Sequence, residues 1–427
     1  MKKWLLCFII LVLFVFIGCG EEEISINFND SDNFKTLNKV LYPNNEYISY
    51  SKLSDTDEIY YGHFNYLNDF MNVTSKKLLN NFNNNIYSPI SLFMALCMLT
   101  EGATLETKDE LLSLLSSNEK QIEDLRIDMN LVYNHNYYSN KHGLSKISNS
   151  IWIRKDKSIN NNYLSVLESS YNANAYETIF DDEGKSNIVD WINGNTNNLL
   201  KLEKENFNID PNTALMLINT VYFDNKWENE FDKLDNFNDM FYGFNANGIE
   251  NHKNVEYMNH VFDSIYYETD NCEIFIDYFK NENMIKIIFP KVNSSIYECL
   301  NSDILTTDIV KKGSPVELDL SIPKFKTNSS FILNDTLVEL GVSKIFSSEA
   351  ELDNIANGLY VSCVKQDAGI ILNEEGVKAA ASTNIFVNES CGPTIQRKVT
   401  LNRPFIYIIC DSHNVPLFIG TVNDPIY

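Results

Sequence analysis

Ala214-Leu-Met-Leu-Ile-Asn-Thr-Val-Tyr-Phe223 is an almost unbroken apolar run in a chain of 427 residues. Several of its residues are β-branched or aromatic, which favours a strand. A strand with one face in water would alternate apolar and polar residues, and this run does not. The run therefore predicts a strand that is covered on both faces, inside a large sheet.

Shorter apolar runs nearer the C-terminus predict further strands. Residues 284–289 form one such run, and residues 318–322 alternate between apolar and polar side chains as a second strand would. Residues 404–410 and 416–422 flank the polar turn Asp411-Ser-His-Asn414, and this arrangement predicts a buried hairpin.

Three other segments have helical patterns. Residues 64–82 place apolar side chains at helical spacing, which predicts an amphipathic helix. Ser88-Pro89 offers an N-cap and a first helical residue to residues 90–99, which are apolar nearly all round and predict a buried helix. Residues 331–340, followed by Gly341, predict a helix with a left-handed C-cap. With the strands, these helices predict one large α+β domain without an internal repeat.

The segment Asn373-Glu-Glu-Gly-Val-Lys-Ala-Ala-Ala-Ser-Thr383 differs from these elements, because it could not anchor a core. As a strand, it would place Lys378 on one face and the small residues Val377, Ala379, Ala381 and Thr383 on the other. Such a segment can slide into an existing sheet without clashing with helices beneath it, and Gly376 would supply the hinge. Taken alone, the segment is better explained as a solvated loop or a short Ala-rich helix.

The wider sequence resembles the serpin family, in four motifs that occur in the expected order. The motifs are Asn85-Ile-Tyr-Ser-Pro-Ile-Ser91, Leu217-Ile-Asn-Thr-Val-Tyr-Phe-Asp-Asn-Lys-Trp227, Ile322-Pro-Lys-Phe-Lys326, and Leu401-Asn-Arg-Pro-Phe405 with Pro416-Leu-Phe-Ile-Gly420. This resemblance implies a serpin domain at residues 63–427 and a reactive loop at about residues 373–400. The implied fold has large mixed β-sheets, surrounding helices and an exposed loop.

The resemblance also implies a function. A serpin is not an enzyme; it inhibits a protease as a suicide substrate, because the cleaved loop inserts into the main sheet while the protease is still attached. The implied hinge residues are Glu374, Glu375, Gly376, Val377, Ala379, Ala380 and Ala381. The implied network at the opening point of the sheet consists of Ser88, Ser91, Asn219 and Gln366.

Two positions depart from the usual pattern of the family. Gln366 stands where most animal members have His, but an amide still donates and accepts hydrogen bonds. Lys378 replaces a common Glu on the face that we expect to stay in solvent. We therefore expect strand insertion to be retained.

The reactive bond is placed by counting along the loop. The family spacing from Glu374 predicts cleavage between Ser390 and Cys391, whereas counting back from Pro404 ends near Pro393. We follow the count from the hinge, because the length of the inserted strand fixes how far the protease travels. The side chains at this bond are small. The expected target is therefore a serine or cysteine protease that prefers small residues, and trypsin-like or chymotrypsin-like proteases are disfavoured.

The N-terminus has the pattern of an exported lipoprotein. Lys2-Lys3 precedes an apolar run at residues 4–17, and Gly18-Cys19 resembles the end of a bacterial lipobox. The prediction is a lipoprotein signal peptide at residues 1–18, lipid on Cys19, and an acidic and polar tether at residues 19–62. The protein would then be anchored to the bacterial membrane on its exported side, at the cell surface or in the periplasm. An uncleaved anchor or an ordinary secretory signal would also fit.

The composition and the motifs limit the kinds of partner and cofactor that we expect the protein to bind. With 34 Lys and Arg against 58 Asp and Glu, the formal charge is −24, so nucleic acid is not an expected partner. We expect a monomer without cofactor or metal, since the sequence has neither a Cys/His zinc spacing nor a hydrolase or phosphate-loop motif. The six His are scattered, and each is interpreted as a surface or structural residue: His63, His135, His142, His252, His260 and His413. The Cys residues of the body suit buried positions, and their pairing is left open.

Two other functions remain open at this point. One is a non-inhibitory serpin-fold carrier or binding lipoprotein, which bulky or Pro-rich hinges would favour and residues 379–383 oppose. The other is a surface lipoprotein that binds a host protein, and it would form no SDS-stable complex with any protease.

Overall fold

The computed structural model describes residues 34–38, 40, 64–207, 209, 213–377 and 396–427. The strands are β1 (Phe34–Thr36), β2 (Asn85–Tyr87), β3 (Tyr138–Asn140), β4 (Gly143–Arg154), β5 (Ala173–Thr178), β6 (Leu215–Lys226), β7 (Phe237–Phe244), β8 (Glu250–Glu268), β9 (Cys272–Tyr278), β10 (Met284–Pro290), β11 (Ser314–Pro323), β12 (Phe325–Ile332), β13 (Cys363–Asn373), β14 (Gly376–Val377), β15 (Gln396–Thr400), β16 (Phe405–Cys410) and β17 (Pro416–Val422). The α-helices are α1 (Asn65–Leu78), α2 (Pro89–Gly102), α3 (Leu105–Ser116), α4 (Ile122–Asn136), α5 (Asn161–Tyr171), α6 (Asp182–Asn195), α7 (Ile296–Leu300), α8 (Ile309–Lys312) and α9 (Asn334–Glu339). Short 3-10 helices are η3 (Lys204–Asn206), η4 (Lys233–Asp235), η5 (Asp303–Thr306) and η6 (Lys344–Phe346).

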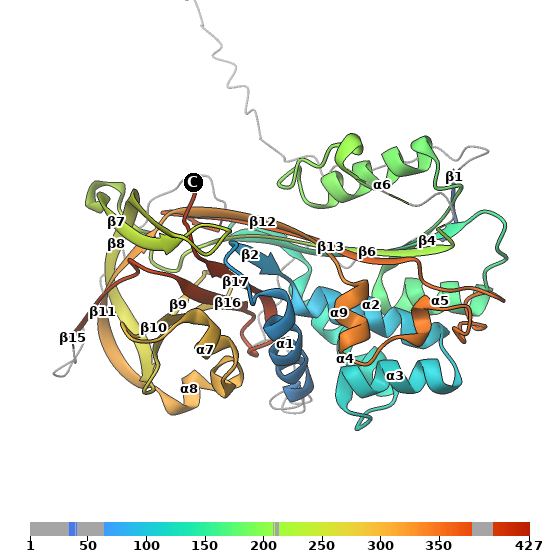
Figure 1. Cartoon of the computed structure of the whole chain (residues 1–427), viewed down its shortest axis with the longest axis horizontal. Coiled ribbons are helices and arrows are strands. Elements are labelled where there is room, and N and C mark those ends of the chain that lie inside the picture. The colour runs from blue at the N-terminus through green and yellow to red at the C-terminus, as the bar shows by residue number, and fades with distance from the viewer. Residues whose placement is uncertain (1–33, 39, 41–63, 208, 210–212, 378–395) are drawn as a thin grey trace, which may run out of the picture.

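The first sheet, here called the main sheet, crosses the whole molecule (Figure 1). Its order is β1-β5-β4-β6-β14-β13-β12, and β3 pairs with β4 outside this path. β6 lies in its middle, antiparallel to β4 and parallel to β13. The prediction that residues 214–223 form an internal strand is therefore confirmed.

The second sheet lies at one end of the molecule (Figure 1). Its order is β15-β11-β8-β9-β10-β16-β17-β2, and β7 pairs with β8 outside this path. β16 and β17 are antiparallel neighbours and are buried throughout. These strands confirm the predicted hairpin, and β10 and β11 confirm the strands predicted at residues 284–289 and 318–322.

Helices cover both faces of the main sheet (Figure 1). α6 lies on one face, and α2 lies on the opposite face with α4 and α5 around it. α2 begins after the N-cap Ser88, whose hydroxyl accepts the Ser91 N–H, and nearly all of its side chains are buried, as predicted. A helix that is apolar all round is stable only when it is enclosed in this way.

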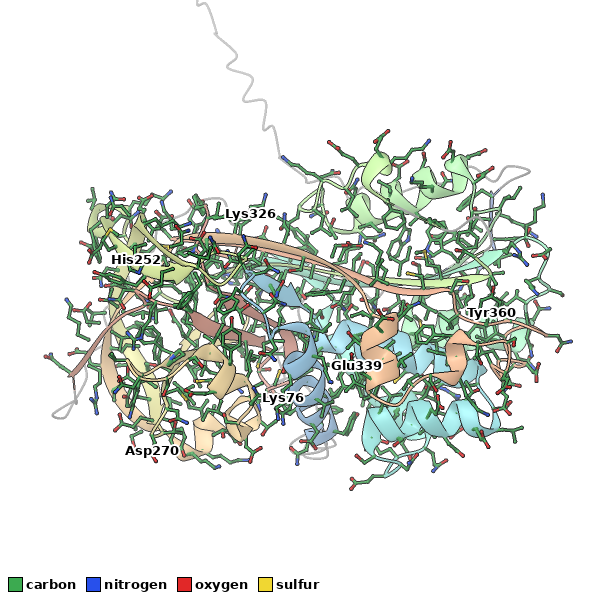
Figure 2. All side chains as sticks on the ribbon, in the orientation of Figure 1. Lys76, His252, Asp270, Lys326, Glu339 and Tyr360 are labelled. Atoms are coloured by element: carbon green, nitrogen blue, oxygen red, sulfur yellow. The ribbon has the colours of Figure 1, made fainter. Side chains whose placement is uncertain are left out.

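Two apolar layers explain why β6 has no polar face. Leu217, Val221 and Phe223 belong to the larger core, between the main sheet, the helices and the second sheet. Met216 and Ile218 point to the opposite face and pack in a smaller core beneath α6. Figure 2 shows side chains filling these layers, with exposed residues such as Lys326 outside them.

Two predicted helices are shorter in the structure. α1 ends at Leu78 rather than at residue 82, and α9 begins at Asn334 rather than at residue 331. Phe331 and Ile332 instead end β12, where they pair with Gln366 and Lys365 of β13. Pairing along a long strand outweighs the local helical pattern there. Gly341 has a φ of 93°, so the predicted left-handed C-cap is present.

A strand also lies within residues 19–62, for which the sequence predicts a tether. Phe34–Thr36 pairs antiparallel with Tyr176–Thr178 of β5 and forms β1 at the edge of the main sheet. In the residues that the structure describes, no helix is long and apolar enough to span a membrane.

Candidate functional site

The main sheet is parted between its two central strands. β6 and β13 pair from Met216 and Cys363 as far as Thr220 and Asp367. Beyond that point, the facing edges at residues 221–224 and 368–371 have no ladder partner among the described residues. Unpaired edges are the places where a sheet accepts another strand.

β14 occupies the far end of this gap. Val377 is the Cα partner of Asn225 on β6 and of Leu372 on β13, so the two-residue strand is paired on both sides. Gly376 has a φ of 143°, and a Cβ there would lie 2.1 Å from the Asn225 carbonyl oxygen. Only glycine fits this backbone and this spacing. The Val377 side chain is 1% exposed and belongs to the larger core.

Hydrogen bonds to its backbone carbonyls hold the segment that enters β14. The Trp227 indole N–H donates to the Asn373 carbonyl at 2.8 Å. The backbone N–H groups of Trp227 and Phe231 donate to the carbonyls of Glu375 and Glu374 at 3.2 and 3.0 Å. Trp227 is itself fixed by stacking on Phe279, with a centroid distance of 4.7 Å. The path of the chain into the gap is therefore set by packed neighbours.

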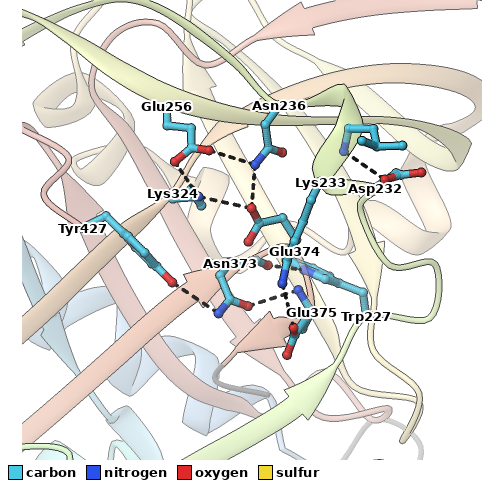
Figure 3. A network of polar contacts seen from close by, with 11 residues as sticks. Trp227, Asp232, Lys233, Asn236, Glu256, Lys324, Asn373, Glu374, Glu375 and Tyr427 are labelled. Atoms are coloured by element: carbon cyan, nitrogen blue, oxygen red, sulfur yellow. Dashed lines mark hydrogen bonds and ion pairs between the residues drawn. The ribbon is translucent and has the colours of Figure 1, made fainter. Parts of the chain in front are cut away.

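The Glu374 carboxylate is the centre of a buried polar cluster (Figure 3). Its Oε1 accepts from Asn236 Nδ2 at 2.6 Å and from Lys324 Nζ at 3.1 Å, and the residue is 5% exposed. Lys324 also pairs with Glu256 at 2.5 Å. Burial alone would raise the pKa of Glu374, but the hydrogen bonds from Asn236 and Lys324 outweigh it and hold this pKa below 4.5. Glu374 is therefore ionised at neutral pH.

Two contacts at the rim of this cluster are weaker. Glu375 pairs with Lys233 at 3.0 Å, but the Lys233 side chain is 64% exposed, so solvent screens the attraction. Asn373 Nδ2 donates to the Tyr427 hydroxyl at 3.4 Å, and the Tyr427 ring lies 5.1 Å from Lys324 Nζ. The C-terminal residue thus contacts the start of the loop (Figure 3).

At the paired end of the gap, Gln366 clamps the start of α2. Its Oε1 accepts the Ser88 N–H at 2.9 Å, and its Nε2 donates to the Ser88 carbonyl at 3.0 Å. The Ser88 hydroxyl is taken by the N–H of Ser91 at 3.3 Å. The contact between Gln366 and Ser88 is thus made through the backbone of Ser88, whose side chain caps the helix.

The Asn219 side chain bonds to Asn149, which lies outside the network that the resemblance implied. Asn219 is the Cα partner of Gln366 and of Asn149, and its side-chain amide donates to Asn149 Oδ1. Asn149 Nδ2 in turn donates to the Tyr171 carbonyl at 2.9 Å. Within the described residues, Asn219 Oδ1 and the Ser91 hydroxyl are buried and have no hydrogen-bond partner. Incomplete hydrogen bonding lowers the cost of separating the strands here.

Several predicted site residues lie outside the described residues. They are Lys378, Ala379, Ala380, Ala381, Ser390, Cys391 and Cys19. The structure brings Glu374, Glu375, Gly376 and Val377 together at one end of the gap, and Ser88, Ser91, Asn219 and Gln366 at the other.

Sequence reasoning missed four residues of the site. Lys324 lies in a quoted motif but had no role there, and Asn236, Glu256 and Asn149 carried no signal. Their partners are distant in the chain; Asn236, for example, lies 138 residues from Glu374. The assembled groups are amides, carboxylates, hydroxyls and ammonium groups, and they suit the holding and exchange of a strand.

Known proteins share this architecture. A family model described as serpin (serine protease inhibitor) matches residues 65–425. Human Serpin B4 is 26% identical over 369 residues, which cover 80% of this chain and 94% of the human protein. The crystal structure of a thermophilic serpin, tengpin, in the native state has a TM-score of 0.77 and 28% identity, and covers 91% of this chain and 100% of tengpin. Thyroxine-binding globulin in complex with thyroxine shares the fold, with a TM-score of 0.74 at 21% identity over 85% of this chain and 100% of the globulin.

Proposed function

This chain belongs to the serpin family, and we propose that it traps a protease by inserting its cleaved loop into the gap between β6 and β13. The observation that carries the proposal is β14, which already pairs with both strands at one end of that gap. The family as a whole supports an inhibitor of proteases rather than an enzyme.

The register of β14 specifies how an inserted strand would pair. β14 is antiparallel to both neighbours, with Val377 opposite Leu372 and Asn225. A continued ladder would therefore place Ala379 opposite Ile370 and Phe223, which both point into the larger core. Ala379 and Ala381 would share the buried face of Val377, where small side chains fit a densely packed layer.

The chemistry would be that of the protease. It would attack the bond between Ser390 and Cys391 and form an acyl-enzyme with Ser390, with the new N-terminus at Cys391 leaving. Insertion would then compete with hydrolysis of that ester, or of the thioester that a cysteine protease forms. It would be driven by backbone hydrogen bonds that the parted edges lack in the described chain. The small side chains at this bond favour a serine or cysteine protease that prefers small residues.

The proposal is tested at the hinge by Ala379→Arg. On insertion, this change would bury a charged side chain without a partner, so the loop should be cut as a substrate and active protease released. Lys378→Glu is the matched control, because residue 378 would lie on the other face and should leave inhibition largely intact. The measurements are the SDS-stable complex, the stoichiometry of inhibition, and the melting temperature before and after loop cleavage.

The cleaved wild type should melt well above the intact protein, and cleaved Ala379→Arg should gain much less. If the cleaved wild type is no more stable than the intact protein, the loop does not insert. The protein would then be a carrier or binding lipoprotein with a serpin fold, and trapping would be excluded.

We also propose that the mature protein is lipid-anchored through Cys19 on the exported side of a bacterial membrane. The support is the charged start, the short apolar run and Gly18-Cys19. Cys19→Ala should lose lipid labelling and leave the membrane fraction, whereas Cys7→Ala, inside the signal, should not. A Cys19→Ala variant that keeps both label and membrane association would contradict the anchor.

A further inference from the structure

Three potential metal ligands form a cluster where α4 meets the second sheet. His135 is in the last turn of α4, and Asp411 and His413 lie in the turn between β16 and β17. One ligand atom from each side chain can be chosen so that all three lie within 4.8 Å of one another. His135 and Asp411 are close in space although they are far apart in the sequence. The neighbouring pair Asn136 and Asp411, which is hydrogen-bonded, is separated by 275 residues.

The carboxylate of the cluster is fixed in place. Asp411 is 0% exposed, and its Oδ1 accepts the backbone N–H groups of His413 and Val415, each at 2.9 Å. Its Oδ2 accepts from Asn136 Nδ2 at 3.0 Å. Each carboxylate oxygen has two acceptor positions, so Oδ2 can bind an ion while keeping the bond from Asn136. Hydrogen bonds of this kind orient ligands in known metal sites.

The two imidazoles of the cluster lie close together. Their ring centroids are 5.6 Å apart, and the rings meet edge to face. An imidazole binds a metal ion in its neutral form, so binding at this site would weaken as the pH falls.

We propose that His135, Asp411 and His413 form a binding site for a divalent transition metal ion of the Zn²⁺ type. Two imidazoles and one carboxylate suit Zn²⁺, Co²⁺ or Ni²⁺, whereas Ca²⁺ and Mg²⁺ prefer oxygen ligands throughout. Ligand atoms around a tetrahedral ion lie roughly 3.4 Å apart, since each is about 2.1 Å from the metal. The spacing of up to 4.8 Å must therefore close by up to about 1.4 Å on binding, through rotation of the side chains.

The ion would join two parts of the molecule. α4 packs against β4 of the main sheet, and the β16–β17 hairpin belongs to the second sheet. A metal that bridges them binds the folded state and not the unfolded one, so it raises the melting temperature as its concentration rises. The site is thus a structural cross-link between α4 and the second sheet.

The test uses the full-length protein, freed of metal with a chelator and titrated with Zn²⁺ against a competing chelator. We expect one equivalent to bind and the melting temperature to rise. His413→Gln and His135→Gln should each weaken binding by about 100-fold or more, since loss of a supporting residue alone costs 10–100-fold. His252→Gln is the control: Figure 2 places His252 near β7 and β8, away from α4, and it should bind Zn²⁺ as the wild type does.

Co²⁺ provides a readout that does not depend on any variant folding. Bound at this site, it should give the spectrum of nitrogen and oxygen ligands, without a thiolate charge-transfer band. Thiolate is the competing source, because Cys272 and Cys299 are adjacent and the hydrogen bond from Cys299 lowers the pKa of Cys272. A thiolate band, Zn²⁺ binding that survives both His variants, or no Zn²⁺ binding at about 10 μM would each overturn the proposal.

Discussion

Glu374 shows how one side chain can hold the entrance to the sheet. Its carboxylate is almost fully buried and bonded to Asn236 and Lys324, while Glu256 supplies the second partner of Lys324. Removing a charge from such a cluster leaves another group underpaired, which costs more than the net value of the lost bond. The position therefore matters for the stability of the intact protein.

Glu374→Gln should lower stability at pH 7 by about 1–3 kcal/mol, because the neutral amide keeps an acceptor for Asn236 but not the charge facing Lys324. Since the folded protein holds the pKa of Glu374 below 4.5, its contribution is complete above pH 4.5 and disappears as the pH falls through the lower, folded value. The melting temperatures of wild type and variant should thus converge in acid.

Glu375→Gln is the control for this residue. Its partner Lys233 is largely exposed, so the loss of that pair should shift the melting temperature much less. Equal shifts for the two variants, or a difference between wild type and Glu374→Gln that stays constant from pH 7 to pH 3, would contradict the role assigned to Glu374.

The element β14 depends on a glycine at position 376. Gly376→Ala should prevent β14 from lying between its neighbours, because the new Cβ would meet the Asn225 carbonyl and the φ of 143° disfavours any side chain. We expect a loss of about 1–3 kcal/mol, faster hydrogen exchange at Val377, and faster proteolytic cutting next to it.

Gly341→Ala is the control that separates the cost of backbone strain from the cost of a steric collision. Gly341 also has a positive φ, of 93°, but nothing lies within 4 Å of a Cβ placed there. This variant should lose about 1 kcal/mol and leave exchange at Val377 unchanged. If Gly376→Ala behaves in the same way, the close approach to Asn225 does not govern the hinge.

The length of an element decided how well it could be predicted from the sequence. β6, α2 and the β16–β17 hairpin each have a long local pattern, and all three lie where the sequence predicted them. β1 and β14 have three and two residues, too few for any periodicity, and pairing with distant strands alone defines them. The start of α9 was misplaced for a related reason, since the pairing of Phe331 with β13 is a long-range contact.

The residues of the site also divide into those that the sequence predicted and those that only distant contacts define. Ser88 lies in a motif, and Gly376, Val377 and Gln366 occupy positions that the resemblance to serpins assigned to the hinge and the network. The structure places them at the two ends of the gap. The bond from Asn219 to Asn149 could not be read from the sequence, because two Asn residues on neighbouring strands carry no signal of their register. The cluster of His135, Asp411 and His413 was missed because His135 lies on α4, far along the chain from the β16–β17 turn that holds the other two residues.

At the scale of the whole molecule, residues 34–36 belong to the edge of the main sheet. Phe34 is 3% exposed; its ring stacks on Tyr176 at 5.4 Å and lies 5.9 Å from Trp152, in the smaller core beneath α6. The Asn38 side chain donates to the Ala173 carbonyl at 2.9 Å and accepts the Ala175 N–H at 2.8 Å. β1 is therefore attached by both packing and hydrogen bonds.

Phe34→Ala should lower the stability of the whole domain by about 3–4 kcal/mol, the usual cost of removing a buried aromatic ring. Lys35→Ala, in the same strand but with an exposed side chain, should change stability by less than about 0.5 kcal/mol. Because β1 and β14 are separated by β5, β4 and β6, hydrogen exchange at Val377 should be unaffected by Phe34→Ala under conditions that favour the folded state. A Phe34→Ala variant as stable as the wild type would mean that β1 only rests on the sheet, and faster exchange at Val377 would mean that the edge of the sheet and its opening are coupled across those strands.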